Sequence, residues 1–131
     1  MIFHSFPTQR ERRHVGGSAF LEVSYCRMSS GTSVKEIVSV RAMEHWQDDS
    51  LFVYLDDLNI FFVEYKDIFI DGTYSNLKNG PIDLWGINYY SPSQVVAIMQ
   101  RIQARKPKDG DVLLKWLQSA NEANGIYVLG I

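Results

Sequence analysis

The stretch LNIFFVEYKDIFIDG, residues 58–72, decides how the centre of this chain folds. Its large apolar side chains recur with the spacing i, i+3, i+4 and i+7, which gathers them on one face of a helix. A strand over the same residues would place Glu64 and Lys66 on the buried face. The spacing therefore predicts a helix over residues 57–71, and Gly72 follows where a C-terminal cap belongs.

Working outward, two more helices and five strands are expected. Ser91, Pro92 and Gln94 form a capping box with proline at the first helical position, which predicts a helix over residues 92–105. Leucines at helical spacing predict a third helix over residues 110–124. Alternating or continuous apolar runs predict strands near residues 19–28, 35–46, 51–55, 82–89 and 126–129.

Residues 34–46 fit two structures. Ser33 and Glu36 match a capping box, which favours a helix, whereas the β-branched residues that follow alternate with polar ones, which favours a strand. A helix would place Arg41 and His45 on its apolar stripe. We therefore predict the strand and keep the helix as the alternative.

The irregular order of these elements predicts a single α+β domain over residues 18–131, built on an antiparallel sheet. A length of 131 residues suits one domain. Residues 1–17 are polar and basic without a period, so they are expected to form a flexible arm. Neither a secretory signal nor an apolar run of membrane-spanning length is present, which predicts a cytoplasmic protein that makes no membrane contact.

The search for catalytic chemistry finds no motif. Cys26 is the single cysteine, and His4, His14 and His45 lie far apart in the sequence, so we expect no metal, no disulfide and no cofactor. Cys26 could meet His45 across a hairpin, but a lone thiol within a strand is more typical of packing than of a nucleophile. The sequence therefore predicts a protein that is not an enzyme.

The net charge of −2 argues against general nucleic-acid binding. The positions of the charges along the chain are more informative. Residues 44–83 contain nine acidic and two basic side chains, a balance of −7, and the rest of the chain contains six and eleven, a balance of +5. The acidic pairs Asp48–Asp49 and Asp56–Asp57 suit turns, and the second suits the N-cap of the first helix. This polarity also fits an acidic surface that docks a basic partner.

Aromatic residues provide the second indication of binding. Trp85, Tyr89 and Tyr90 lie close together around a strand that leads into a helix. We expect Trp85 in the core, whereas core packing and exposure are equally open for Tyr89 and Tyr90. Tyrosines that are exposed, Tyr74 included, would be suitable anchors for a protein partner.

From about Phe52 to its end, the chain resembles bacterial immunity proteins, in particular those that neutralise the toxin tips of contact-dependent growth inhibition systems. The resemblance rests on the spaced patterns Phe61-x-x-Glu64-Tyr65-x-x-Ile68-Phe69-x-x-Gly72-x-Tyr74-Ser75, Trp85-Gly-Ile-Asn-Tyr-Tyr90-Ser91, Lys106-Pro107, Leu114-x-Trp116-Leu117 and Asn124-Gly-Ile-Tyr-Val-Leu-Gly-Ile131. It implies a small cytoplasmic inhibitor, bound one-to-one to a toxin domain that is often a nuclease.

Together, the charge pattern and the resemblance predict an immunity protein whose acidic surface blocks a basic toxin domain. The expected contact residues are Asp48, Asp49, Asp56, Asp57, Glu64, Asp67, Asp71, Tyr74, Tyr89 and Tyr90. Two alternatives stay open: a small enzyme whose site is assembled from distant residues, and a regulatory or adaptor domain that uses the basic residues 10–13.

Overall fold

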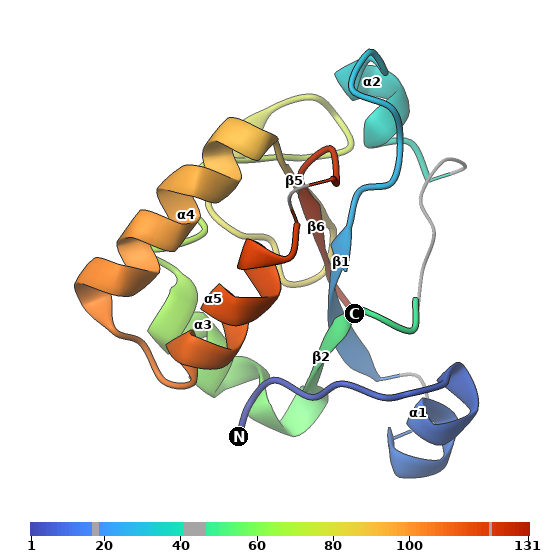
Figure 1. Ribbon diagram of the computed structural model, residues 1–131, viewed down its shortest axis with the longest axis vertical. Helices are drawn as coiled ribbons and strands as arrows, with labels where there is room; N and C mark the ends of the chain where they lie inside the picture. Colours follow the sequence, from blue (N-terminus) through green and yellow to red (C-terminus); the bar gives the residue numbers. More distant parts are fainter. Residues whose placement is uncertain (17–18, 41–46, 121) are drawn as a thin grey trace.

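The computed structural model describes residues 1–16, 19–40, 47–120 and 122–131. Six strands form one antiparallel sheet in the order β2-β1-β6-β5-β3-β4 (Figure 1). The strands are β1 (Phe20–Tyr25), β2 (Leu51–Tyr54), β3 (Gly72–Thr73), β4 (Asn79–Gly80), β5 (Ile87–Tyr90) and β6 (Ile126–Leu129). The helices are α1 (Gln9–Gly16), α2 (Val34–Ile37), the 3-10 turn η1 (Leu55–Asp57), α3 (Leu58–Tyr65), α4 (Pro92–Arg105) and α5 (Gly110–Gln118).

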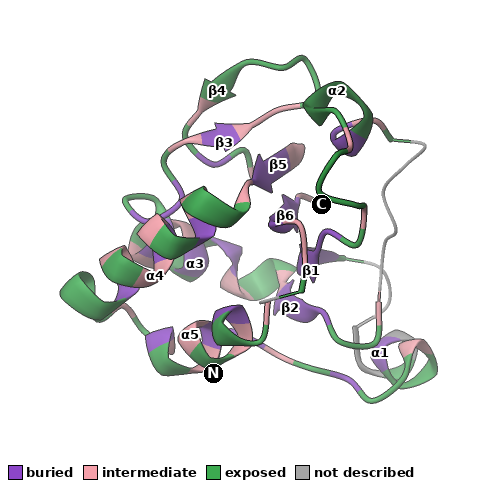
Figure 2. Cartoon of the chain, turned by 45° about the horizontal axis from the view of Figure 1, so that its top comes forward, coloured by how far each residue is buried: buried purple, intermediate pink, exposed green. Residues whose placement is uncertain are grey.

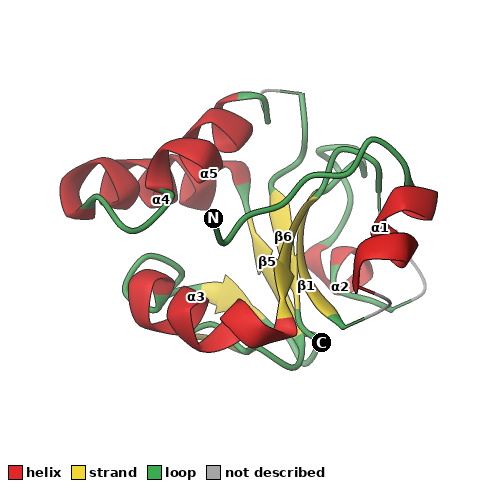
Figure 3. Ribbon diagram, turned by 90° about the horizontal axis from the view of Figure 1, so that it is seen from below, coloured by secondary structure: helices red, strands yellow, loops and turns green. Residues whose placement is uncertain are grey.

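Helices α3, α4 and α5 cover one face of the sheet, which we call the inner face (Figure 3). Leu21 and Val23 of β1 meet Phe61 and Tyr65 of α3 in the main core, and all four side chains are fully or almost fully buried. This packing confirms the amphipathic helix predicted at the centre of the chain. The predicted α+β class with an antiparallel sheet is likewise confirmed.

The opposite, outer face is covered by α1, α2 and the segment that contains Phe6 (Figure 3). Phe6 packs there against Phe20 and Phe52, and Ile37 packs in a separate cluster with Tyr127. Figure 2 shows that β1, β5 and β6 are buried along much of their length. Strand β1 is therefore buried on both faces, although its alternation is typical of a half-buried strand.

The predicted bounds of one helix and one strand agree with the structure. Helix α4 spans the predicted residues 92–105, with both bonds of the Ser91–Gln94 capping box in place, and β6 spans 126–129. Helices α3 and α5 end earlier than predicted, at Tyr65 and Gln118. The predicted strand at 82–89 begins only at Ile87.

The strand predicted near residues 35–46 is wrong over its described part. Residues 34–37 form the short helix α2, and Ser33 Oγ accepts a hydrogen bond from the Glu36 N–H, as the alternative interpretation required. The Ser33 cap favours the helix because it begins a helical turn. That turn ends at Ile37, so the helix does not reach Arg41 and His45 and places neither of them on its apolar stripe. Residues 41–46 lie outside the described part of the chain.

The flexible arm predicted over residues 1–17 does not match the described part of that segment. Ile2 and Phe3 are buried in the main core, and the backbone of His4 exchanges two hydrogen bonds with Phe52 at 2.8 and 2.9 Å. The Ile2 N–H also donates to Asp109 Oδ2 at 2.7 Å. The short β3 and β4 strands, which have too few residues to show a period, are not predicted either.

Within the described ranges, no helix has both the length and the apolar composition needed to cross a membrane.

Gly125 should be intolerant of substitution. Its φ of +84° is a conformation that side chains disfavour, and a Cβ there would overlap the carbonyl oxygen of Tyr90. We expect Gly125→Ala to lower the free energy of unfolding by about 3 kcal/mol. Urea denaturation checks this, with Gly31→Ala as the control because a Cβ at that position would have no neighbouring atom within 4 Å. Equal effects of the two substitutions would contradict the backbone argument.

Tyr65 and Tyr90 offer a matched test of buried hydroxyl groups. The Tyr65 hydroxyl donates to the Lys108 carbonyl at 2.7 Å, whereas the buried Tyr90 hydroxyl has no hydrogen-bond partner among the described residues. Tyr65→Phe should therefore destabilise the fold by about 1 kcal/mol, and Tyr90→Phe should be neutral or stabilising. Thermal unfolding of both variants measures the difference, and a larger loss for Tyr90→Phe would refute it.

Candidate functional site

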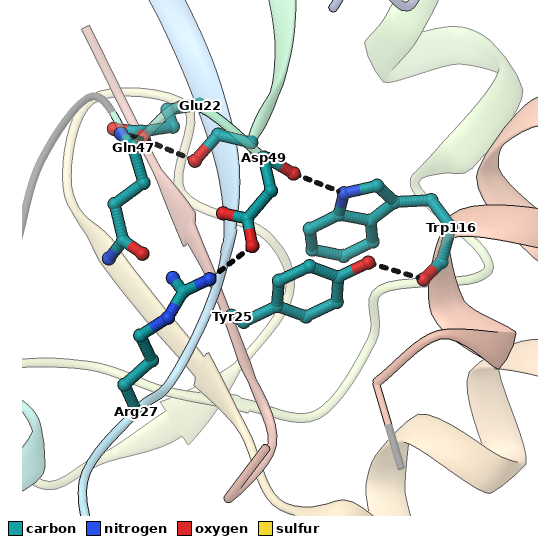
Figure 4. Close-up of polar contacts among 7 residues, drawn as sticks. Glu22, Tyr25, Arg27, Gln47, Asp49 and Trp116 are labelled. Atoms are coloured by element: carbon teal, nitrogen blue, oxygen red, sulfur yellow. Dashed lines mark hydrogen bonds and ion pairs between the residues drawn. The ribbon is translucent and has the colours of Figure 1, made fainter. Parts of the chain in front are cut away.

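The loop that enters β2 carries the predicted contact residues Asp48 and Asp49. Figure 4 shows Asp49 and its partners. The Asp49 carboxylate forms an ion pair with Arg27, and the Asp49 carbonyl accepts the Trp116 indole N–H at 2.7 Å. Asp48 is exposed, and its carboxylate accepts a long hydrogen bond from the Gln9 amide, at 3.5 Å. Asp48 therefore keeps its charge available to a partner, whereas Asp49 is largely engaged within the chain.

Tyr25 and Trp116 form a stacked pair beside this loop. Their ring centroids are 3.9 Å apart with an interplanar angle of 9°, and the Tyr25 hydroxyl donates to the Trp116 carbonyl at 2.7 Å. Burial, and secondarily the nearby Asp49 carboxylate, raises the pKa of Tyr25 to about 12. The hydroxyl is therefore protonated at neutral pH, and its proton is used in a structural bond.

A shallow cavity of about 310 Å³ opens next to the stacked pair. Its lining includes one cation and two carboxylates, and the members are Tyr25, Arg27, Asp49, Ser119, Glu122 and Ala123. Because Arg27 pairs with Asp49, Glu122 is left as the lining charge without an ion pair among described residues. The cavity therefore offers polar contacts to a small group.

Sequence reasoning missed the buried polar groups on the outer face. Glu22, 1% exposed, accepts hydrogen bonds from Ser50 Oγ at 2.7 Å and the Gln47 N–H at 3.1 Å. Arg12, also 1% exposed, lies over the rings of Phe20 and Phe52. The presence of Glu22 in an apolar strand is the only available signal, and alternation alone assigns it to the solvent-facing half of the strand.

Asp56 and Asp57 occupy η1, where β2 leads into α3. Asp57 is the N-cap residue of α3, but its side chain makes no capping hydrogen bond. Neither carboxylate forms an ion pair with a basic side chain in the described ranges. The predicted capping role is therefore not filled by a side-chain bond, and a fixed junction presents Asp56, which is exposed, beside the partly exposed Asp57.

The acidic residues of α3 and its C-terminal turn face the basic end of α4 instead. Glu64 Oε1 accepts the Lys108 N–H at 2.7 Å, and two ion pairs follow along the helices. These pairs are Asp67–Arg105, with N···O 3.6 Å, and Asp71–Arg101, with N···O 3.7 Å. This part of the acidic centre is thus partly neutralised within the chain, which makes it the weaker part of the predicted surface.

The tyrosines predicted as anchors are mostly internal. Tyr89 and Tyr90 are 3% and 0% exposed, so the prediction that they contact a partner is wrong. They are buried because α2 covers the outer face over Tyr89 and the helices cover the inner face over Tyr90. Tyr74 is partly exposed, but its hydroxyl is bonded to the Pro81 carbonyl.

Trp85 has the opposite outcome. The core position expected for it is wrong, because 64% of its surface is exposed. The residues predicted to contact a partner thus do not form one continuous site. Asp48, Asp56 and Asp57 are available, and among the described aromatic residues Trp85 has the most exposed large side chain.

No group of three or more His, Cys, Asp or Glu side chains in the described ranges is arranged to hold a metal ion. Cys26 is buried, with its thiol 3.7 Å from the Tyr127 hydroxyl. This environment is that of a packing residue. Comparison of the chain with family models, curated proteins and solved structures found no match.

The tyrosines should make stability depend on alkaline pH. Burial raises the pKa of Tyr25 and of Tyr89 to about 12, from 10.0. The folded state therefore holds these protons more tightly than the unfolded state. Their contribution to the free energy of unfolding is complete below pH 10 and is lost as the pH rises towards 12. Urea midpoints at about pH 9, 10 and 11, with tyrosinate absorbance as a second signal, should show this decline. Ionisation of all tyrosines near pH 10 without unfolding would contradict it.

Proposed function

We propose that this chain is a bacterial immunity protein, which binds a basic toxin domain of the nuclease class one-to-one in the cytoplasm and blocks it without catalysis. The observation that carries the proposal is the Asp56–Asp57 pair. Both carboxylates reach solvent, free of capping bonds and free of ion pairs with described residues. Charges exposed in this way at the junction of β2 and α3 are available for a partner's cations.

The physical argument is electrostatic complementarity. A nuclease must present basic groups to bind phosphates, so carboxylates that occupy or cover its cleft compete with the substrate. Fields from unpaired carboxylates accelerate the association of oppositely charged proteins and select against other partners. Asp48 adds a further exposed charge, whereas Glu64, Asp67 and Asp71 contribute less because they already interact with the α4–α5 region.

The fold also changes how the adaptor alternative must be tested. Deleting residues 1–17 would remove Ile2 and Phe3 from the core, so loss of function would report unfolding rather than a lost contact. Substitution of the exposed Arg10 tests a role of the basic segment without removing core residues.

The proposal predicts that the chain rescues cells from the toxin domain encoded directly upstream of its gene. Asp56→Lys combined with Asp57→Lys should slow association about tenfold at low salt, because attraction becomes repulsion. Stopped-flow association kinetics at two salt concentrations would measure the change, and growth of cells that produce both proteins would report neutralisation.

The control is Glu11→Lys combined with Asp111→Lys, which changes the net charge equally at exposed positions outside the acidic centre. Thermal unfolding of both double variants confirms that they are folded, since Lys at the start of α3 opposes the helix dipole. If both pairs slow association equally, placement of the charge is irrelevant and the acidic-surface mechanism is wrong. Lack of rescue by the unmodified chain refutes the immunity function.

A further inference from the structure

Trp85 lies in the turn between Asp83 and Gly86 that leads into β5. With 64% of its surface exposed, the side chain is the most open of the large aromatic residues in the described ranges. Burial of the indole therefore contributes only part of the stability that a core tryptophan would provide. Burial of the indole therefore does not explain why the fold holds this turn in place.

The turn is held by the fully buried Asn88. Asn88 Oδ1 accepts the Asp83 N–H at 2.8 Å, and Nδ2 donates to the Asp83 carbonyl at 2.8 Å and to the Val128 carbonyl at 3.0 Å. Asp83 Oδ1 in turn accepts the Trp85 N–H at 2.9 Å. Together these bonds tie the backbone of Trp85 to β5 and β6.

The end of the chain fixes the other side of the turn. The Gly130 N–H donates to the Gly86 carbonyl at 2.8 Å, and the Ile131 N–H donates to the Leu84 carbonyl at 3.1 Å. A Cβ at Gly130 would lie 2.6 Å from the Gly86 nitrogen, so only glycine allows strand and turn to approach this closely. The backbone around Trp85 is thus constrained from both directions.

The Trp85 turn and the Asp56–Asp57 pair lie at the same end of the sheet. Ile87, at the start of β5, pairs with Leu129, at the end of β6, and Tyr54 at the end of β2 pairs with Phe20 at the start of β1. Three strand spacings of about 4.8 Å separate β5 from β2, a distance of roughly 15 Å. One interface of ordinary size, about 800 Å² on each partner, spans both features.

We infer that Trp85 is a preorganised apolar anchor for the basic toxin domain, and that it enters an apolar pocket beside that domain's cationic cleft. The inference rests on the proposed function and adds the contact that supplies most of the affinity. The solvent-accessible carboxylates Asp56, Asp57 and Asp83 lie at the same end of the sheet, and their negative charge complements a basic partner. Because the backbone of the turn that carries Trp85 is already held, binding orders less of the chain than it would in a loose loop.

The test uses the purified toxin domain encoded directly upstream as the probe and measures its affinity by titration calorimetry. Trp85→Ala should weaken binding about 30-fold or more, as expected for a central aromatic anchor, and should leave the thermal midpoint nearly unchanged. Val96→Ala is the control, because it shortens an apolar side chain that is 50% exposed on α4. Trp85→Phe should recover part of the lost affinity.

Asp83 variants separate rigidity from charge. Asp83→Asn keeps an acceptor for the Trp85 N–H and removes the charge, whereas Asp83→Ala removes both. If the held turn matters, Asp83→Ala weakens binding several-fold more than Asp83→Asn does. Equal effects of these two variants would overturn the preorganisation.

The outcomes distinguish the two proposals. Binding by the unmodified chain that is unaffected by Trp85→Ala overturns the anchor and leaves the immunity function standing. Failure of the unmodified chain to bind or neutralise the domain overturns the immunity function and the anchor together.

Discussion

The burial of β1 on both faces is the constraint from which the rest of the structure follows. It places the Glu22 side chain inside the protein, where its oxygen atoms require hydrogen-bond partners. The loop at Gln47–Ser50 supplies two of them, so the same contacts that satisfy Glu22 fix the entry to β2. The Trp116 indole then binds the Asp49 carbonyl and joins α5 to that loop. The contacts with Glu22 thus fix the loop that presents Asp48 to solvent.

The inner layer was predictable from sequence, and the outer layer was not. Helices α3 and α4 are evident from apolar spacing and capping residues, because each signal lies within or directly beside the element that it defines. The cover of the outer face depends on Phe6 and Arg12, which lie in a polar segment without a period. Their burial is created by distant partners on β1 and β2, so no local pattern encodes it.

The acidic centre shows the same division between local and distant information. Counting charges along the chain correctly located the excess of carboxylates in residues 44–83. It did not show that the approach of α4 brings Arg101 and Arg105 to Asp71 and Asp67. Exposed pairs of this kind add little stability, but they do reduce the field that a partner would encounter. The available charge is therefore concentrated at Asp48 and at η1.

Aromatic residues that are near one another in sequence are separated in the structure for a geometrical reason. Tyr89 and Tyr90 lie within β5, where successive side chains enter opposite layers and both layers are closed. Trp85 precedes the strand and the part of it that the two layers cover. It lies in a turn whose backbone is hydrogen-bonded to the buried Asn88. Two of the three hydrogen bonds of the buried Asn88 amide end on Asp83, so the amide is fully satisfied only while the turn keeps its shape. Distorting the turn would leave the Asn88 amide without these two hydrogen bonds, and the free-energy cost of that loss keeps the turn in place. The exposure of Trp85 is therefore coupled to the stability of the sheet.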